Sequence, residues 1–249
     1  MNTTLKIKIK FMKKKYLILG ATGSVGSALA NLLYDDKIDC HLVARNEDEV
    51  KKVAEKLSYT YSVCDVLKLD FINDLKKDLI ETEILGIAYC VGSIDIKPLR
   101  LTKASDFVSS YVLNLVAVTD VIRSFQDNLK NNKGSVVLFS TVAAKKGFAN
   151  HSIISSAKAA VEGLTVALAA ELAPDIRINC IAPSLTKSKI ASSIIKNPSI
   201  EQSIAKMHPL KRLGEGADSA NLANFLLTSK SSWITGQIIA VDGGRSNIA

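Results

Sequence analysis

The sequence predicts an α/β domain in which parallel strands form one sheet with helices on both faces. Short apolar runs that read as buried strands alternate with longer amphipathic stretches along nearly the whole chain. Strands that alternate with helices are typical of a doubly wound parallel sheet. The length of 249 residues suits a single domain of this class.

Seven apolar runs are expected to form the strands. They are Tyr16–Gly20, Cys40–Ala44, Tyr59–Cys64, Ile84–Cys90, Gly134–Ser140, Ile176–Ile181 and Gln237–Val241. The stretches between them repeat apolar residues at helical spacing, as Val25, Leu29 and Leu32 do. The expected helices are Val25–Tyr34, Glu47–Leu57, Asp70–Ile80, Thr102–Leu129 and Ile153–Ala173, the last ended by Pro174.

The stretch Ser184–Leu213 departs from this alternation. It holds two short expected helical pieces, rich in Ile and Ser, that are broken by Pro198 and Pro209. Ligands of such sheets bind beyond the carboxyl ends of the strands. The stretch is therefore either a mobile cover for an apolar substrate or a packed helical insertion.

The net charge of +8 comes mainly from the start of the chain. The first fifteen residues hold six lysines and no acid, so the rest has 26 basic and 24 acidic residues. We expect residues 1–12 to be a disordered basic tail and residues 13–249 to be the domain. A tail that touches nucleic acid or a membrane is the alternative. Neither partner is expected, because no apolar run approaches about 18 residues and basic residues do not alternate with aromatic ones.

The cysteine and histidine patterns exclude two kinds of site. The four cysteines, Cys40, Cys64, Cys90 and Cys180, are irregularly spaced and form no C-x-x-C pair. They are expected to be buried, reduced thiols, with the chain in the cytoplasm. The three histidines and four cysteines lack the spacing of metal ligands, so no metal site is expected.

A glycine-rich turn follows the first expected strand and leads directly into a helix. Glycines permit a tight turn and let the backbone approach a pyrophosphate, which rests on the helix N-terminus. This context predicts dinucleotide binding and a Rossmann-type domain. The expected contacts are Gly20, Thr22, Gly23, Ser24, Val25 and Gly26.

The end of the second strand favours NADP(H) over NAD(H). An acid that holds the ribose 2′-hydroxyl of NAD usually stands there, but this chain has Ala44 followed by Arg45. A guanidinium can pair with the 2′-phosphate of NADP. Asp65, at the end of the third strand, can accept a hydrogen bond from the adenine amino group or can cap the following turn.

Motifs spread from about Lys15 to Arg245 resemble the short-chain dehydrogenase/reductase family. Besides the glycine turn, they are Asp65-Val66, Asn114-Leu115, Gly134–Val137, Ala157–Leu164, Arg177–Pro183, Trp233–Gln237 and Asp242–Gly244. The resemblance implies further cofactor contacts at Val66, Val91, Gly92, Lys158, Pro183 and Ser188.

The resemblance also implies an active site of Asn, Ser, Tyr and Lys, with the Tyr four residues before the Lys. Asn114 and Lys158 match, and Thr141 keeps a hydroxyl at the Ser position. Ile154 replaces the Tyr, and an aliphatic side chain cannot donate a proton. The enoyl reductases of this superfamily place their Tyr seven residues before the Lys, where this chain has His151.

We therefore expect His151 to be the proton donor, because imidazole can act as a general acid near neutral pH. The alternative is a loop histidine that caps the start of the following helix or is bonded to backbone. The expected function is reduction of a ketone or 3-oxoacyl-type carbonyl with NADP(H). The alternatives are an enoyl-thioester reductase and a catalytically silent nucleotide-binding subunit or sensor. Family members commonly form dimers or tetramers through their two long helices, here Thr102–Leu129 and Ile153–Ala173.

Overall fold

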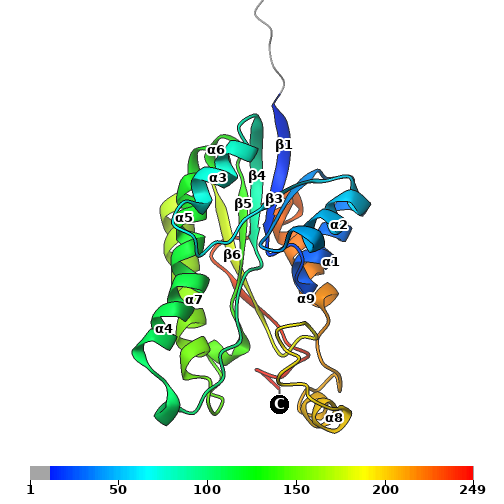
Figure 1. The fold of residues 1–249 in the computed structure, drawn as a ribbon, viewed down its shortest axis with the longest axis vertical. Coiled ribbons are helices and arrows are strands. Elements are labelled where there is room, and N and C mark those ends of the chain that lie inside the picture. Colours follow the sequence, from blue (N-terminus) through cyan, green and yellow to red (C-terminus); the bar gives the residue numbers. More distant parts are fainter. Residues whose placement is uncertain (1–11, 249) are drawn as a thin grey trace, which may run out of the picture.

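All the strands of the sheet are parallel, and their order is β3-β2-β1-β4-β5-β6-β7. The computed structural model describes residues 12–248 of the chain (Figure 1). The strands are β1 (Lys13–Leu19), β2 (Cys40–Ala44), β3 (Thr60–Val63), β4 (Thr82–Tyr89), β5 (Ser135–Phe139), β6 (Arg177–Pro183) and β7 (Ile238–Val241). The predicted seven-stranded, doubly wound Rossmann-type sheet is confirmed.

Helices cover both faces of the sheet (Figure 1). One layer contains α1 (Ser24–Asp35), α2 (Glu47–Leu57) and α9 (Gly216–Leu227). The other contains α3 (Phe71–Asp78), α4 (Ala104–Tyr111), α5 (Ala117–Ser124), α6 (Gln126–Asn131) and α7 (Ser152–Leu172). The remaining helix, α8 (Pro198–Lys206), lies beyond the carboxyl ends of the strands.

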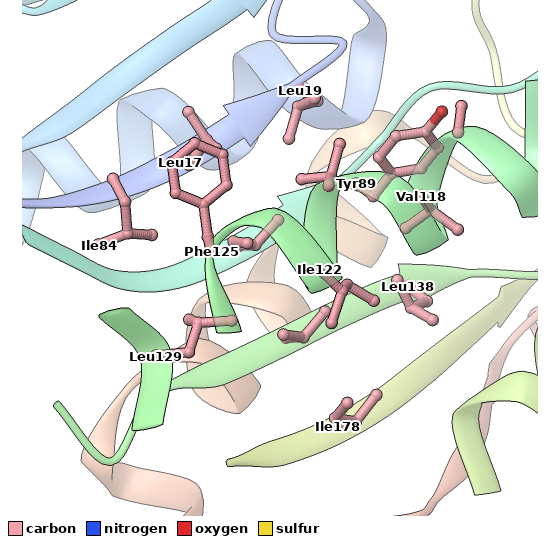
Figure 2. Close-up of a cluster of buried hydrophobic side chains, with 14 of the residues drawn as sticks. Leu17, Leu19, Ile84, Tyr89, Val118, Ile122, Phe125, Leu129, Leu138 and Ile178 are labelled. Carbon is pink, nitrogen blue, oxygen red and sulfur yellow. The ribbon is translucent and has the colours of Figure 1, made fainter. Parts of the chain in front are cut away.

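The second helix layer packs on the sheet through a cluster of large apolar side chains (Figure 2). In that cluster, Leu17 and Ile84 of the central strands meet Ile122 of α5 and Phe125, and all four are at most 5% exposed. Burial of one such side chain contributes about 1.5–3 kcal/mol. This core fixes the central strands, whose carboxyl ends carry the expected site.

The helix predicted over Thr102–Leu129 is divided, which corrects that prediction. A π-helical turn, Val112–Val116, separates α4 from α5, and a break at Phe125 separates α5 from α6. Inside the π turn, the Asn114 amide nitrogen donates to the carbonyl oxygen of Ser110 at 2.9 Å. The side chain thus satisfies a backbone group of the preceding turn, where the regular bonding of the helix changes.

The stretch Ser184–Leu213 contains one α-helix, so the prediction of two helical pieces was wrong. Pro198 begins α8 instead of breaking a helix, because proline suits the first helical turn, where its missing N–H is not needed. The helix α9 was not predicted. The expected basic tail lies almost wholly outside the residues that the structure describes.

By length and composition alone, two helical segments could cross a membrane. A search for unbroken apolar runs in the sequence did not identify them. They are Ala104–Ser124, which spans α4 and α5, and Ser152–Leu172. Both pack on the sheet through buried residues such as Val118 and Val161. Core helices of globular domains pass the same test.

Candidate active site

A cavity of about 750 Å³ lies along the carboxyl edge of the sheet, between the strand ends and the segment that contains α8. The last residues of four strands line it: Leu19 of β1, Ala44 of β2, Phe139 of β5 and Pro183 of β6. The cavity therefore occupies the place where this class of sheet binds ligands.

The glycine turn forms one wall of the cavity. Gly20 has a φ of +78°, and a Cβ there would lie 2.8 Å from the carbonyl carbon of Cys90. A Cβ on Gly26 would lie 2.3 Å from the Gly20 carbonyl oxygen. Among the residues that the structure describes, no side chain caps the N-terminus of α1, and the first turn of this helix holds no acidic residue. Its amide groups are therefore available to a pyrophosphate, so the turn fits a dinucleotide.

Arg45 and Asp65 lie at the adenosine end of the expected site, and both line the cavity. The Arg45 side chain is exposed after the buried Ala44. One carboxylate oxygen of Asp65, Oδ1, accepts from the Leu67 amide at 3.1 Å, as a turn cap does. The other oxygen, Oδ2, remains available to an adenine amino group.

An ion pair that the sequence did not predict lies beside Arg45. Lys189 Nζ, from the segment that precedes α8, lies 2.5 Å from the Glu49 carboxylate on α2. The pKa of Glu49 is lowered mainly by this contact, and Arg45 and Thr22 lower it further. A carboxylate therefore lies close to the guanidinium that the sequence assigned to the 2′-phosphate.

Lys158 is buried on α7 and faces the cavity. Its ammonium donates to the Phe139 carbonyl oxygen at 2.8 Å. Burial lowers its pKa from 10.5 to about 8. Two groups converge at Gly92, since a Cβ placed there would lie 3.2 Å from both Lys158 Nζ and Asn114 Oδ1.

Asn114 stands behind the cavity wall, not on it. Its side chain is 1% exposed, and its Oδ1 has no hydrogen-bond partner among the described residues. A buried acceptor without a donor costs about 1–3 kcal/mol. A water molecule or ligand group near Gly92 and Lys158 would satisfy it.

Thr141 and Ile154 lie on the same cavity, Thr141 just after β5 and Ile154 in the first turn of α7. The Thr141 hydroxyl oxygen accepts from the Ala143 amide at 3.3 Å, which leaves its proton free to donate. Ile154 is 4% exposed, so aliphatic carbon forms the wall where the family carries a phenol.

His151 immediately precedes α7 and lines the cavity together with Ile154 and Lys158. Its Nδ1 lies 2.7 Å from the Ala149 carbonyl oxygen. A carbonyl only accepts, so Nδ1 carries a proton and Nε2 is the nitrogen left for a ligand. The ring packs against Phe148, with centroids 5.5 Å apart. Both readings from the sequence, a backbone-bonded histidine and a cavity group, describe its position.

The other predicted residues divide into three groups. Those that line the cavity are Val66, Val91, Gly92, Pro183 and Ser188. The second group is Cys90, which also lines the cavity. Burial raises the pKa of its thiol to about 12, so the reactive thiolate is not formed at neutral pH. His41 and His208 are buried and do not line the cavity, although His208 bonds the cavity residue Ser184. The part of the chain that the structure describes holds no cluster of metal-ligating side chains.

The cavity residues that the sequence did not predict include Phe148, Ser184, Met207 and Arg245. They come from three separate segments that the fold brings together, so no local motif joins them. Two signals were available. Ser184 stands where the resembled family has glycine, and Arg245 directly follows the matched Asp242–Gly244 turn.

Known proteins are similar to this chain over most of its length. A family model described as enoyl-(acyl carrier protein) reductase matches residues 20–246. A chloroplastic tropinone reductase homologue of Arabidopsis thaliana is 31% identical over 240 residues, covering 92% of this chain and 74% of the relative. Dehydrogenase/reductase SDR family member 4 of Mus musculus is 31% identical over 245 residues, covering 93% and 86%.

Solved structures are similar over the whole domain. A short-chain type dehydrogenase/reductase from Mycobacterium ulcerans superposes with a TM-score of 0.86 at 26% identity, covering 96% of this chain and 91% of that chain. ElxO with NADP bound gives 0.83 at 25% identity, covering 94% and 99%. A tyrosine-to-phenylalanine variant of ElxO with NADPH bound gives 0.84 at 25% identity, with the same coverage.

Proposed function

The chain belongs to the short-chain dehydrogenase/reductase family, and from that premise we propose that it reduces a ketone or 3-oxoacyl-type carbonyl with NADPH, using His151 as proton donor. The observation that carries the proposal is the shared cavity. His151, Thr141 and Lys158 line the same cavity as the glycine turn. Members of the family are oxidoreductases, so the proposal concerns the cofactor, the substrate and the proton donor.

The proposed cofactor residues lie along one edge of the sheet. The uncapped N-terminus of α1 binds the pyrophosphate, with Gly20 and Gly26 allowing close approach. Arg45 pairs with the 2′-phosphate, and the Lys158 ammonium donates to the ribose of the nicotinamide half. When bound, the reduced nicotinamide supplies a hydride, which is one proton and two electrons.

The proposed proton path uses His151 and Thr141. The hydride forms a new C–H bond at the carbonyl carbon, and the oxygen then needs one proton to become a hydroxyl. The protonated imidazole delivers it from Nε2, because Nδ1 is committed to the Ala149 carbonyl. Thr141 donates a hydrogen bond that orients the oxygen. Loss of a general acid typically slows a reaction about 10²–10⁴-fold.

A catalytically silent nucleotide-binding subunit is the second candidate. The buried Ile154 favours it, because it places aliphatic carbon where the family carries a phenol. The ElxO variant is also relevant, since it holds NADPH after one tyrosine is replaced by phenylalanine. By analogy, this chain can bind NADPH whether or not it turns over a substrate.

The test combines binding with turnover. Affinities of the purified chain for NADPH and NADH are measured first. Loss of NADPH absorbance is then followed with simple ketones, 3-oxoacyl thioesters and enoyl thioesters, on the unchanged chain and on His151→Phe. His41→Asn serves as the control, because that histidine lies outside the cavity.

Each outcome selects one candidate. Ketone turnover that falls about 10²-fold or more in His151→Phe, with unchanged NADPH affinity, supports the proposal. Turnover restricted to enoyl thioesters selects an enoyl reductase. Tight NADPH binding without turnover of any substrate selects the silent subunit. Turnover that His151→Phe leaves unchanged removes His151 from the mechanism.

We also propose that two copies pair through α4, α5 and α7. This helix layer carries exposed valines: Val108 on α4, Val116 in the π turn and Val166 on α7. Exposed apolar side chains of this kind are typical of an interaction site. A cytoplasmic location remains a prediction from the sequence.

A further inference from the structure

We propose that Arg245 selects carbonyl substrates that carry a carboxylate at the end remote from the reacting carbonyl. This inference rests on the proposed function and names the class of substrate that the site would take. It starts from a cation that lines the substrate end of the cavity and has no part in the cofactor site described above.

The backbone holds Arg245 in a fixed turn. Gly243 and Gly244 have φ angles of +60° and +86°, which suit glycine. The Asp242 carboxylate accepts hydrogen bonds from the amides of Gly244 and Ser246 and from the Ser246 hydroxyl. Lys146 Nζ donates to the Arg245 carbonyl oxygen at 2.7 Å. The turn therefore presents the Arg245 side chain to the cavity from a rigid base.

Among the described residues, the guanidinium of Arg245 forms no ion pair with a carboxylate. Its carbon lies 4.7 Å from the centre of the Phe148 ring, and Nη2 lies 3.5 Å from the Met207 sulfur. Sulfur accepts hydrogen bonds weakly, and an arginine has five N–H donors. Across residues 12–248, no carboxylate lies within 4.0 Å of this guanidinium. Burial also lowers its pKa, as expected for a cation partly removed from water.

The other charges on the cavity wall already have partners or proposed roles. Arg45 and Lys158 are assigned to the cofactor, and Lys189 is paired with Glu49. Asp65 is the one acidic residue among those described on the wall, and it lies at the adenosine end. The Asp242 carboxylate acts on the pKa of Arg245, but it does not line the cavity and already accepts three hydrogen bonds within its own turn. Arg245 is therefore a cation on the wall that can bind an anion of the substrate.

The surroundings of Arg245 set the rest of the substrate's chemistry. Met207 lies against Arg245, and the lining of the cavity also includes Ile94, Ile96, Ile190, Ile194 and Ile204. An apolar body with a single carboxylate matches both the lining and the lone guanidinium, which can bind a carboxylate through two parallel hydrogen bonds. Phe148 packs against both Arg245 and His151, so one aromatic ring separates the anion site from the proposed proton donor.

The first experiment measures binding, so it does not require turnover. The chain is loaded with NADPH and titrated calorimetrically with octanoate and with methyl octanoate, which share a body and differ in charge. Octanoate should bind at least tenfold more tightly than the ester. Arg245→Gln should remove that preference, Arg245→Lys should keep part of it, and Arg123→Gln on α5 should leave it unchanged.

The second experiment measures reduction of straight-chain oxo carboxylic acids and their methyl esters. The unchanged chain should have a kcat/KM at least tenfold higher for the acid. Arg245→Gln should lower kcat/KM for the acid, mainly by raising KM. For the ester, kcat/KM of the variant should stay within about threefold of the value for the unchanged chain. Equal loss for acid and ester would show that Arg245 only supports the structure, and would overturn the proposal.

The two failures are distinguishable. If the unchanged chain binds octanoate no better than its ester, the inference is wrong, whether or not ketones are reduced. If octanoate is preferred through Arg245 but no carbonyl compound is reduced, the proposed reductase fails and the anion site stands. The comparison of acid with ester on the unchanged chain remains decisive even if an Arg245 variant does not fold.

Discussion

The hydroxyl of Ser184 lies 2.8 Å from Nε2 of His208, and this bond joins the end of β6 to the segment that follows α8. The Nδ1 of His208 faces the Ile204 carbonyl oxygen at 2.9 Å, so Nδ1 carries the proton and the serine donates to Nε2. Both side chains are buried, at 9% and 1% exposed. One hydrogen bond therefore fastens the segment after α8 to the end of β6, beside the cavity.

Ser184→Ala should destabilise the domain by about 1–3 kcal/mol, because it leaves a buried ring nitrogen without its donor. Urea unfolding measures the loss. The exposed Ser192, whose hydroxyl donates to the Lys189 carbonyl in the same segment, gives a matched control. Ser192→Ala should cost much less. Equal effects of the two changes would mean that the buried bond does not fasten the segment after α8.

Lys158→Met should make the folded chain more stable at pH 7 while it weakens NADPH binding. Burial lowers the Lys158 pKa from 10.5 to about 8, so keeping the cation costs about 3 kcal/mol at pH 7. The substitution also removes the hydrogen bond to the Phe139 carbonyl, which destabilises the variant by about 1 kcal/mol. The net stabilisation of Lys158→Met is therefore about 2 kcal/mol. The affinity for NADPH should fall about 10–100-fold, since one charge-assisted hydrogen bond is lost.

The pH dependence of the Lys158 effect has a defined sign. Between pH 8 and 10.5 the unfolded chain binds the Lys158 proton and the folded chain has released it. The free energy of unfolding of the unchanged chain therefore rises through that window relative to Lys158→Met. Urea unfolding at pH 7 and pH 9.5 tests this. A constant difference between the two proteins would mean that Lys158 has an ordinary pKa in the folded chain.

The sequence predicted the sheet and the glycine turn at its edge because both depend on local patterns. The strands are short apolar runs, and the glycine turn is contiguous from Gly20 to Gly26. The helix α9 was missed because its side chains are mostly small or polar, so its apolar stripe is weak. It packs by close approach instead: a Cβ on Gly216 would lie 2.1 Å from the Ser24 carbonyl oxygen.

The substrate end of the site was not predictable for a different reason. Phe148, Met207 and Arg245 meet only through the fold, and each alone has an ordinary structural reading. The break in the long helix was hidden too, because the backbone bond of Asn114 to Ser110 does not appear in the apolar periodicity. His151 was predicted as a site residue from its spacing to Lys158, and both residues line the same cavity. Its chemistry remains a proposal.

Arg45→Gln should lower the affinity for NADPH about tenfold and leave that for NADH within about twofold, because only NADPH carries the 2′-phosphate. Fluorescence titration of each nucleotide measures both. Glu49→Gln should act in the opposite direction, since it removes a carboxylate close to Arg45. Arg123→Gln is the control, because that arginine pairs with Asp120 on α5. Equal loss for both nucleotides would leave Arg45 without a part in the choice of cofactor.

Val166→Glu should convert the proposed dimer to a monomer. Val166 is 50% exposed on α7, and burial of a new carboxylate at an apolar interface costs several kcal/mol. Light scattering coupled to size-exclusion chromatography gives the mass of each variant. Ile80→Glu is the control, because Ile80 is 80% exposed and follows α3, outside the proposed interface. A dimer that survives Val166→Glu, or a chain that is already monomeric, would exclude this interface.

His41 should make the domain less stable in mild acid. Its ring is 2% exposed and bonds the hydroxyls of Thr60 and Ser62. Burial lowers its pKa from 6.5 to about 4; Lys15 lowers it further, and Asp78 and Asp39 oppose the shift. The neutral ring is therefore favoured in the folded chain, and its stabilising effect is complete above pH 6.5.

As the pH falls from 6.5 towards 4, the unfolded chain takes up the His41 proton and the folded chain does not, so the free energy of unfolding decreases. At pH 5, protonation linked to His41 alone should have lowered the free energy of unfolding by about 2 kcal/mol relative to neutral pH. His41→Asn keeps a hydrogen-bonding side chain that does not titrate, so it should lose about 2 kcal/mol less than the unchanged chain between pH 8 and pH 5. Urea unfolding at those two values measures the difference. Parallel losses would assign the acid sensitivity to other groups, because every other titrating side chain is shared by the two proteins.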